Sequence, residues 1–338
     1  PHMVYPLFCK RNTMKFFTIL IVLLLAFSDI YARTIIDDYG RSVNVPDKIT
    51  KIYAASPPLT MSLIAFDPAV IAALNSPFKK EQIPYVGTAA SKPVAGGFFG
   101  QGNTPNYEVL AASKPDVIIM WGKMTGGQNA ADKLSALGIP VLLVRNDSIN
   151  DIISQFKLYG KLTGNTKRAD ELINYTKETL NLISSLQDNI NARKKVHYYF
   201  AHGLDGLTSE CEGSFHLEPF KYTGAKNALN CRMTSNFGME KISMEQIFLS
   251  DPDIIIAMEA AFASSVRQDP KWKNLRAVKS GHILTVPFVP FNYITRPPSF
   301  MRLIGIRWLI HSFYPDLVKP IDQEKKRFEK LFFPRFKT

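Results

Sequence analysis

One short sequence unit occurs twice in this chain, and the repeat limits the folds that are possible. The first copy, YEVLAASKPDVII, spans residues 107–119, and the second, MEQIFLSDPDIII, spans residues 244–256. Each copy has a glutamate at its second position, a short helical pattern, a Pro-Asp turn and a final apolar run. Such a run after a turn is typical of a buried parallel strand. The duplication therefore predicts two lobes of similar α/β topology.

The remaining sequence alternates in the same way between short apolar runs and amphipathic stretches. This alternation is typical of doubly wound units, so we expect α/β architecture with two Rossmann-like lobes, each with a parallel-sheet core. The predicted strands are residues 49–54, 69–74, 117–121, 141–144, 195–200, 254–258 and 282–286. A ligand cleft is expected between the two lobes.

A stretch with helical periodicity joins the two halves. We predict one long rigid helix at residues 148–191, with a bend at Gly160 or Gly164. The expected organisation is then an N-terminal lobe at 34–147 and a C-terminal lobe with a terminal helix at 192–338. A rigid helix in place of a flexible linker would limit how far the lobes can swing.

The N-terminus has the pattern of a secretory signal peptide. Met14-Lys15 precedes an apolar run at residues 16–27, which is shorter than the about 20 residues of a spanning helix. We assign residues 1–33 to a tag remnant, upstream residues and a cleaved signal peptide. No cysteine follows the run, so we expect a periplasmic chain without a lipid anchor that begins near Arg33. The alternative is a retained membrane anchor.

Export to the periplasm would place the two cysteines of the expected mature chain, Cys211 and Cys231, in an oxidising compartment. Cysteines in an oxidising compartment can pair, and closing a loop of this length would stabilise the fold by about 3 kcal/mol. We predict a disulfide, with two separate buried thiols as the alternative. The pair alone lacks the spacing of a zinc site.

The formal net charge of +12 does not indicate nucleic-acid binding, because Lys and Arg are spread along the chain rather than clustered. The sequence also contains no dinucleotide, phosphate-loop, nucleophile-elbow or zinc-protease motif. We therefore expect a chain that is not an enzyme and has no catalytic residues. We also expect it to be a monomer. An alternative from another class stays open: a periplasmic α/β hydrolase that uses Ser56 or Ser214 with a histidine.

The chain resembles a known family, the helical-backbone class of periplasmic binding proteins, which serve ABC importers of siderophores, haem, cobalamin and related metal chelates. The resemblance extends from about Thr34 to Pro315. Its landmarks, in order, are residues 36–41, the first repeated unit, residues 162–164, residues 224–228, the second repeated unit and Pro298-Ser299. It implies that one glutamate on each lobe docks onto arginines of the membrane permease. By position, these glutamates are Glu108 and Glu245. The alternative is that each only stabilises the start of its helix.

Ligands of doubly wound sheets bind beyond the carboxyl ends of the strands, so the loops that follow the predicted strands hold the candidate contacts. Aromatic faces and a few cations there suit a bulky, partly apolar chelate. The candidate ligand-binding residues are Ser56, Phe99, Trp121, Lys123, His202, Phe215, Phe291, Tyr293 and Arg296. Arg296 could hold a ligand carboxylate with Tyr293 beside it. The alternative for Arg296 is a solvated loop position.

His202 and His216 are the candidate metal ligands, each able to occupy an open position on a bound metal. The alternative is that both are structural. Because no His, Cys or carboxylate cluster has the spacing of a closed metal site, we expect no intrinsic cofactor and a metal that arrives with its own chelator.

These inferences predict the substrate-binding component of an ABC importer, which captures an iron, nickel or cobalt chelate of low charge and delivers it to the permease. A haem or cobalamin receptor of the same class is the alternative. At the C-terminus, residues 323–335 are expected to form a helix that packs on the second lobe through Phe328, Leu331 and Phe332. The alternative is a membrane-surface role for this basic and aromatic stretch.

Overall fold

The computed structural model describes residues 32–98, 105–123, 127–136, 138–234 and 238–333. The predicted signal peptide and the residues before it therefore lie outside the described chain, except Ala32 and Arg33. These two residues begin β1 (Ala32–Ile36), which pairs antiparallel with β2 (Ser42–Pro46) to form a hairpin. Over the described ranges, no helix is both long and apolar enough to cross a membrane.

The first lobe is built on a parallel sheet of order β3-β4-β5. Every residue of β3 (Ile52–Ala54), β4 (Val117–Trp121) and β5 (Val141–Val144) is buried, which explains their unbroken apolar sequences. The helices and 3-10 turns of this lobe are α2 (Pro57–Phe66), η1 (Pro68–Val70), η2 (Lys80–Gln82), α3 (Ile83–Val86), η3 (Gly87–Ser91), α4 (Tyr107–Ser113) and α5 (Gly127–Ser135).

The predicted strand at residues 69–74 is wrong. Its first residues lie in the 3-10 turn η1, and only isolated bridges from Ile71 to Ile52 and from Leu74 to Val94 follow. Pro68 opens the turn, and the Asp67 side chain accepts a hydrogen bond from the backbone N–H of Ala69. This local turn competes with strand pairing, although the segment is as apolar as a buried strand.

The second lobe has a parallel sheet of order β11-β10-β6-β8 and a two-stranded antiparallel sheet, β7-β9. Its strands are β6 (His197–Ala201), β7 (Thr208–Ser209), β8 (Lys226–Asn227), β9 (Glu240–Lys241), β10 (Ile254–Ala257) and β11 (Ile283–Thr285). Its short helices are η4 (Phe215–Leu217), α9 (Glu218–Lys221), α10 (Met244–Ser250), α11 (Ala260–Ser265) and α12 (Arg276–Lys279). The prediction of two α/β lobes with parallel-sheet cores is confirmed.

The aspartate of the repeated Pro-Asp turn has the same structural role in both lobes. Asp116 accepts hydrogen bonds from the backbone N–H groups of Thr50 and Lys51, at 2.7 and 2.8 Å, just before β3. Asp253 accepts from the backbone N–H of His197 at 2.8 Å, where β6 begins. Each carboxylate therefore fixes the start of the neighbouring parallel strand, which explains why the turn sequence is shared.

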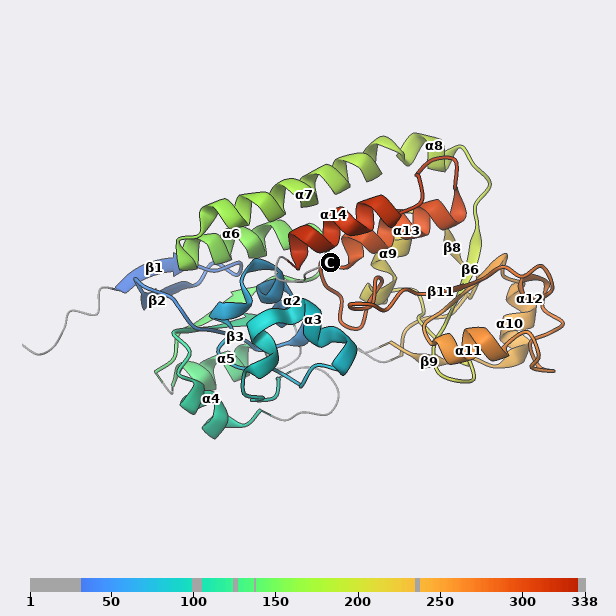
Figure 1. The fold of residues 1–338 in the computed structure, drawn as a ribbon. Coiled ribbons are helices and arrows are strands. Elements are labelled where there is room, and N and C mark those ends of the chain that lie inside the picture. The colour runs from blue at the N-terminus through green and yellow to red at the C-terminus, as the bar shows by residue number, and fades with distance from the viewer. Residues whose placement is uncertain (1–31, 99–104, 124–126, 137, 235–237, 334–338) are drawn as a thin grey trace, which may run out of the picture.

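The segment between the lobes is helical, as predicted, but it is not one continuous helix over residues 148–191. It divides into α6 (Asp151–Thr163), α7 (Thr166–Ser185) and α8 (Gln187–Asn191). Gly164 ends α6 with a φ of 81°, so the expected bend is a complete break. At Gly160 a Cβ would lie 2.7 Å from that of Ala169, so the close packing of α6 on α7 requires glycine there. Figure 1 shows α7 running from the first lobe to the second.

The terminal helix α14 (Asp322–Phe332) does not pack on the second lobe alone, as its sequence suggested. Its Phe332 ring lies 5.3 Å from Tyr175 of α7 and 6.3 Å from Phe156 of α6. Phe333 contacts Tyr85 of the first lobe at 5.6 Å. On its other side, α14 contacts α13 (Arg302–Phe313) of the second lobe (Figure 1). The amphipathic pattern located the buried face but not the surfaces that cover it.

Candidate ligand-binding site

Five polar side chains gather after strand ends in the second lobe, and we call them the Glu210 cluster: His202, Glu210, Ser214, Glu259 and Arg296. His202 follows β6, and Glu259 comes after β10. The buried Glu210 carboxylate accepts a hydrogen bond from Arg296 and another, at 2.7 Å, from the Ser214 hydroxyl. The His202 Nε2 atom lies 3.8 Å from the same carboxylate. The cluster therefore brings together two of the predicted ligand contacts, His202 and Arg296.

The backbone around the cluster is fixed by local constraints. Cys211, the neighbour of Glu210, forms a disulfide with Cys231, with the two Cα atoms 5.1 Å apart. At Gly238, a Cβ would lie 1.9 Å from the Glu210 carboxylate, so only glycine fits. Arg296 has a φ of 57°, a left-handed conformation that its neighbours must hold in place. These constraints preorganise the carboxylate and the guanidinium.

Burial sets the charge of the cluster. It lowers the pKa of His202 to about 3, with the positive charge of Arg296 as a second cause, so this imidazole is neutral at physiological pH. Burial also raises the pKa of Glu259 above its ordinary value. One guanidinium thus faces two carboxyl groups and a neutral imidazole, and the cluster carries no net positive charge.

Three buried polar atoms just beyond strand ends have no hydrogen-bond partner within the described chain. They are Ser56 Oγ after β3 in the first lobe, and His202 Nε2 and Glu259 Oε2 in the second. Leaving a buried polar group unpaired costs about 1–3 kcal/mol, so such atoms are rare. Their position beyond parallel strands is where α/β proteins bind ligands.

Trp121, at the carboxyl end of β4, joins the two lobes. Its ring packs edge-on against Phe215 of the second lobe, with centroids 5.7 Å apart. Its indole N–H donates to Asp147 at 2.9 Å, and the exposed Lys123 ammonium lies 3.9 Å from the same carboxylate. Of the predicted residues, Trp121, Lys123 and Phe215 therefore lie together at a contact between lobes.

Phe291 and Tyr293 lie in the packing around the terminal helix. Phe291 stacks on Phe333 with centroids 6.0 Å apart and meets Phe78 of the first lobe at 6.3 Å. Tyr293 is only 1% exposed. Burial raises its pKa, and Glu329 of α14 is the charged group that adds to this shift. The expected pairing of Tyr293 with Arg296 around a ligand carboxylate stays a prediction.

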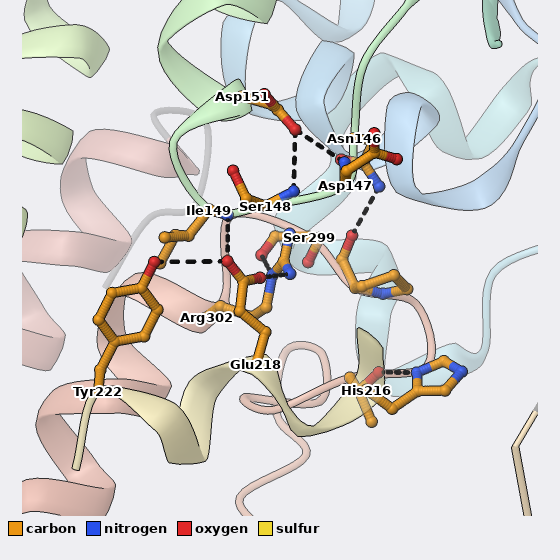
Figure 2. A network of polar contacts seen from close by, with 12 residues as sticks. Asn146, Asp147, Ser148, Ile149, Asp151, His216, Glu218, Tyr222, Ser299 and Arg302 are labelled. Carbon is orange, nitrogen blue, oxygen red and sulfur yellow. Dashed lines mark hydrogen bonds and ion pairs between the residues drawn. The ribbon is translucent and has the colours of Figure 1, made fainter. Parts of the chain in front are cut away.

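The remaining predicted residues, His216 and Phe99, are not part of these groups. His216 hydrogen-bonds through Nδ1 to the Thr295 hydroxyl (Figure 2). Phe99 lies outside the described residues.

In the parts of the chain that are described, no three His, Cys, Asp or Glu side chains are grouped so that they could hold a metal ion. Ser214 donates to Glu210, and among the described residues neither it nor Ser56 bonds to an imidazole, so the serine–histidine pair of the hydrolase alternative is not formed there.

Sequence analysis missed a buried ion pair at the base of the lobes, Glu218 with Arg302 (Figure 2). One oxygen of Glu218 pairs with Arg302, and the other accepts from the backbone N–H of Ile149 at 2.7 Å. Arg302 is 1% exposed and also donates to the Ser299 carbonyl at 3.3 Å. The pair therefore ties the start of the linking segment to α9 and α13.

Asp151 completes this network from the linking side. Its carboxylate accepts hydrogen bonds from the backbone N–H groups of Asp147 and Ser148, at 2.7 and 2.8 Å, and so closes the first turn before α6. Asn146 reaches the Pro298 carbonyl at 3.4 Å (Figure 2). A carboxylate at a helix start is a recognisable sequence signal, whereas nothing near Glu218 in the sequence points to Arg302.

The chain is similar to known proteins in sequence and in fold. A family model described as periplasmic binding protein matches residues 85–290. The ABC transporter substrate-binding lipoprotein YvrC of Bacillus subtilis is 25% identical, covering 86% of this chain and 88% of its own length. The molybdate-binding protein MolA of Haemophilus influenzae is 22% identical over 92% of this chain and 94% of its own.

Solved structures agree with these relatives. An ABC transporter solute-binding protein from Sulfurospirillum deleyianum superposes with a TM-score of 0.81 at 31% identity, covering 89% of this chain and 95% of that one. The structure of MolA with molybdate has a TM-score of 0.69 at 19% identity, covering 89% of this chain and 98% of its own, a likeness of fold.

Proposed function

Since this chain belongs to the periplasmic binding protein family of ABC importers, whose members are receptors rather than enzymes, we propose that it captures a metal chelate of low net charge between its lobes. The observation that carries the proposal is the set of partnerless buried atoms beyond the strand ends, Ser56 Oγ, His202 Nε2 and Glu259 Oε2. A bound molecule would satisfy donors and acceptors that the chain itself leaves unpaired.

The charge of the Glu210 cluster supports a ligand of low charge. A multiply charged anion would gain from several cations, but the single guanidinium of Arg296 is already engaged by Glu210. A small oxyanion such as molybdate, the ligand in MolA's name, would meet two carboxyl groups there. An iron, nickel or cobalt chelate of low charge fits this mixed donor and acceptor set better.

His202 would contact the chelate directly. A neutral imidazole has a lone pair on one ring nitrogen, and metal ligation or hydrogen-bond acceptance requires that lone pair. Ser56 would contact the ligand from the first lobe, and Trp121 with Phe215 would supply aromatic surface at the lobe contact. His216 is hydrogen-bonded through Nδ1 to the Thr295 hydroxyl, and we assign it a supporting role there.

Delivery would follow capture. The helix α7 and the Glu218–Arg302 pair would allow only a small closure of the lobes. Glu108 and Glu245 are exposed in the first turns of α4 and α10, and they would dock onto the membrane permease. We place the mature chain in the periplasm as a disulfide-bonded monomer, with lobes at 34–147 and 192–338.

Native mass spectrometry of the purified chain tests the ligand class. The protein would be mixed with ferric siderophores, nickel with and without histidine, cobalamin, haem, ferric citrate and molybdate. We expect one complex with a chelate of low charge, and substitution of His202 by Ala should weaken it. Selective binding of molybdate or ferric citrate would contradict the proposal.

A further inference from the structure

The two repeated helices present equivalent faces with different chemistry. Positions three and four residues after a helical glutamate share its face. In α4 these positions after Glu108 are exposed alanines, Ala111 and Ala112. In α10 the equivalent positions after Glu245 are Phe248 and Leu249, which are 43% and 80% exposed. The second lobe therefore carries large apolar side chains where the first carries methyl groups.

A hollow of about 480 Å³ lies beside Phe248, and charged side chains line it. Its lining includes Asp251, Arg276 and Lys279. The Asp251 carboxylate is held by Arg276 at 3.0 Å, whereas no described residue forms an ion pair with the exposed Lys279. The face thus combines a carboxylate at Glu245, an apolar centre and a free cation.

We infer that Phe248 and Leu249, with Lys279 at their edge, form an apolar docking surface for the membrane permease, which the first lobe lacks. The inference rests on the proposed function, in which Glu245 docks on that permease. The partner surface would offer an arginine to Glu245, apolar side chains to Phe248 and Leu249, and a carboxylate to Lys279. We call these three residues with Glu245 the α10 face.

The duplication favours the permease over a second copy of this chain. The α10 face is the counterpart of a face on α4 that keeps the glutamate, so both helices suit contacts with one large partner.

The unequal faces would also fix orientation. A receptor whose two lobes present the same face could dock in either of two orientations. An apolar surface on one lobe alone makes the two contacts distinguishable by chemistry. The second lobe would therefore hold the tighter of the two contacts with the permease.

Site-specific photo-crosslinking in the native host tests the inference. The photoreactive amino acid p-benzoylphenylalanine would replace Leu249, Ala112 of the α4 face, or Ile36, an apolar residue of β1 that is 68% exposed. Mass spectrometry would identify each crosslinked protein. We expect position 249 to crosslink to a permease subunit of an ABC importer with the highest yield, position 112 to crosslink more weakly, and position 36 not at all.

The outcomes separate the two levels of the proposal. Crosslinks to the permease from position 112 but not from 249 would overturn the α10 inference while keeping the docking function. Permease crosslinks from neither position would overturn both. Crosslinks from position 249 to a second copy of the chain would replace the permease by a dimer contact.

A substitution experiment provides a quantitative test of the inference. The double variant Phe248→Ser with Leu249→Ser should lower the permease crosslink from position 112 at least tenfold, because burial of even one of these two side chains is worth about that factor. The matched control is Ala111→Ser with the same reporter, which should change the yield less than twofold. An unchanged yield in the double variant, in protein that melts at the wild-type temperature, would overturn the inference.

Discussion

His202 links the chemistry of the site to the stability of the fold. Its folded pKa is lowered from 6.5 to about 3, so between these values the unfolded chain binds a proton that the folded chain excludes. The stability contributed by neutral His202 is complete above pH 6.5 and falls as the pH falls. Between pH 7 and pH 4.5 we expect a loss of about 2–3 kcal/mol from this group.

Chemical denaturation at the two pH values measures this loss. In His202→Gln, which cannot take up a proton, the free energy of unfolding should fall less over the same range. Glu259 remains in both proteins, and its raised pKa acts in the opposite direction, so it cancels in the difference. Equal pH dependence in the two proteins would mean that His202 titrates normally.

The Glu218–Arg302 pair should matter through what remains when one partner is lost. Arg302→Met leaves a buried carboxylate without its cation, which typically costs about 3–5 kcal/mol. Adding Glu218→Gln to that variant should recover part of the loss. Urea unfolding of the single and double variants checks this, and a single variant as stable as wild type would show that the pair is not buried in solution.

The residues of the site were predictable from the sequence to different degrees. Ser56, Trp121 and His202 could be proposed because they lie at or just after the ends of recognisable strands. Glu210 and Glu218 could not, since their partners Arg296 and Arg302 lie more than eighty residues away and no local pattern records such a distance.

Among the elements, those with a clear period were predicted and those with competing local chemistry were not. The buried strands β4 and β10 follow from their apolar runs, and α4 and α10 follow from the short helical pattern that opens with a glutamate in each copy of the repeat. Residues 69–74 failed because a proline-led turn competes with a strand. For α14 the sequence gives the apolar face, but its covering surfaces come from both lobes and the linking helices.

The bridging position of α14 predicts a large cost for Phe332→Ala. The ring is fully buried against Phe156, Tyr175 and Phe300, so removing it should destabilise the protein by about 3–5 kcal/mol. Thermal and urea unfolding measure the effect. Leu331→Ala, at a partly buried position on the same helix, is the matched control. A cost below that of the control would contradict the bridging position.

At the scale of the whole molecule, capture and delivery should be separable. Glu108→Ala with Glu245→Ala removes both proposed docking carboxylates, which lie on exposed helix starts away from the Glu210 cluster. Uptake should fall at least tenfold while ligand affinity stays within twofold of wild type. Glu81→Ala, which removes an exposed carboxylate elsewhere on the first lobe, should leave uptake unchanged. Unchanged uptake in the double variant would show that other groups dock.

The most direct test of capture between the lobes is a fluorescence titration that uses Trp121 as the reporter, because its ring contacts Phe215 of the opposite lobe. The wild-type chain would be titrated with ferric siderophores, nickel with histidine, cobalamin and haem. Trp121→Phe is the control. We expect one chelate to quench the wild-type signal saturably at micromolar concentration or below, and the control to lose the quenching while calorimetry still detects binding. Saturable binding that leaves the Trp121 signal unchanged, or no response to any chelate, would contradict capture of a chelate between the lobes.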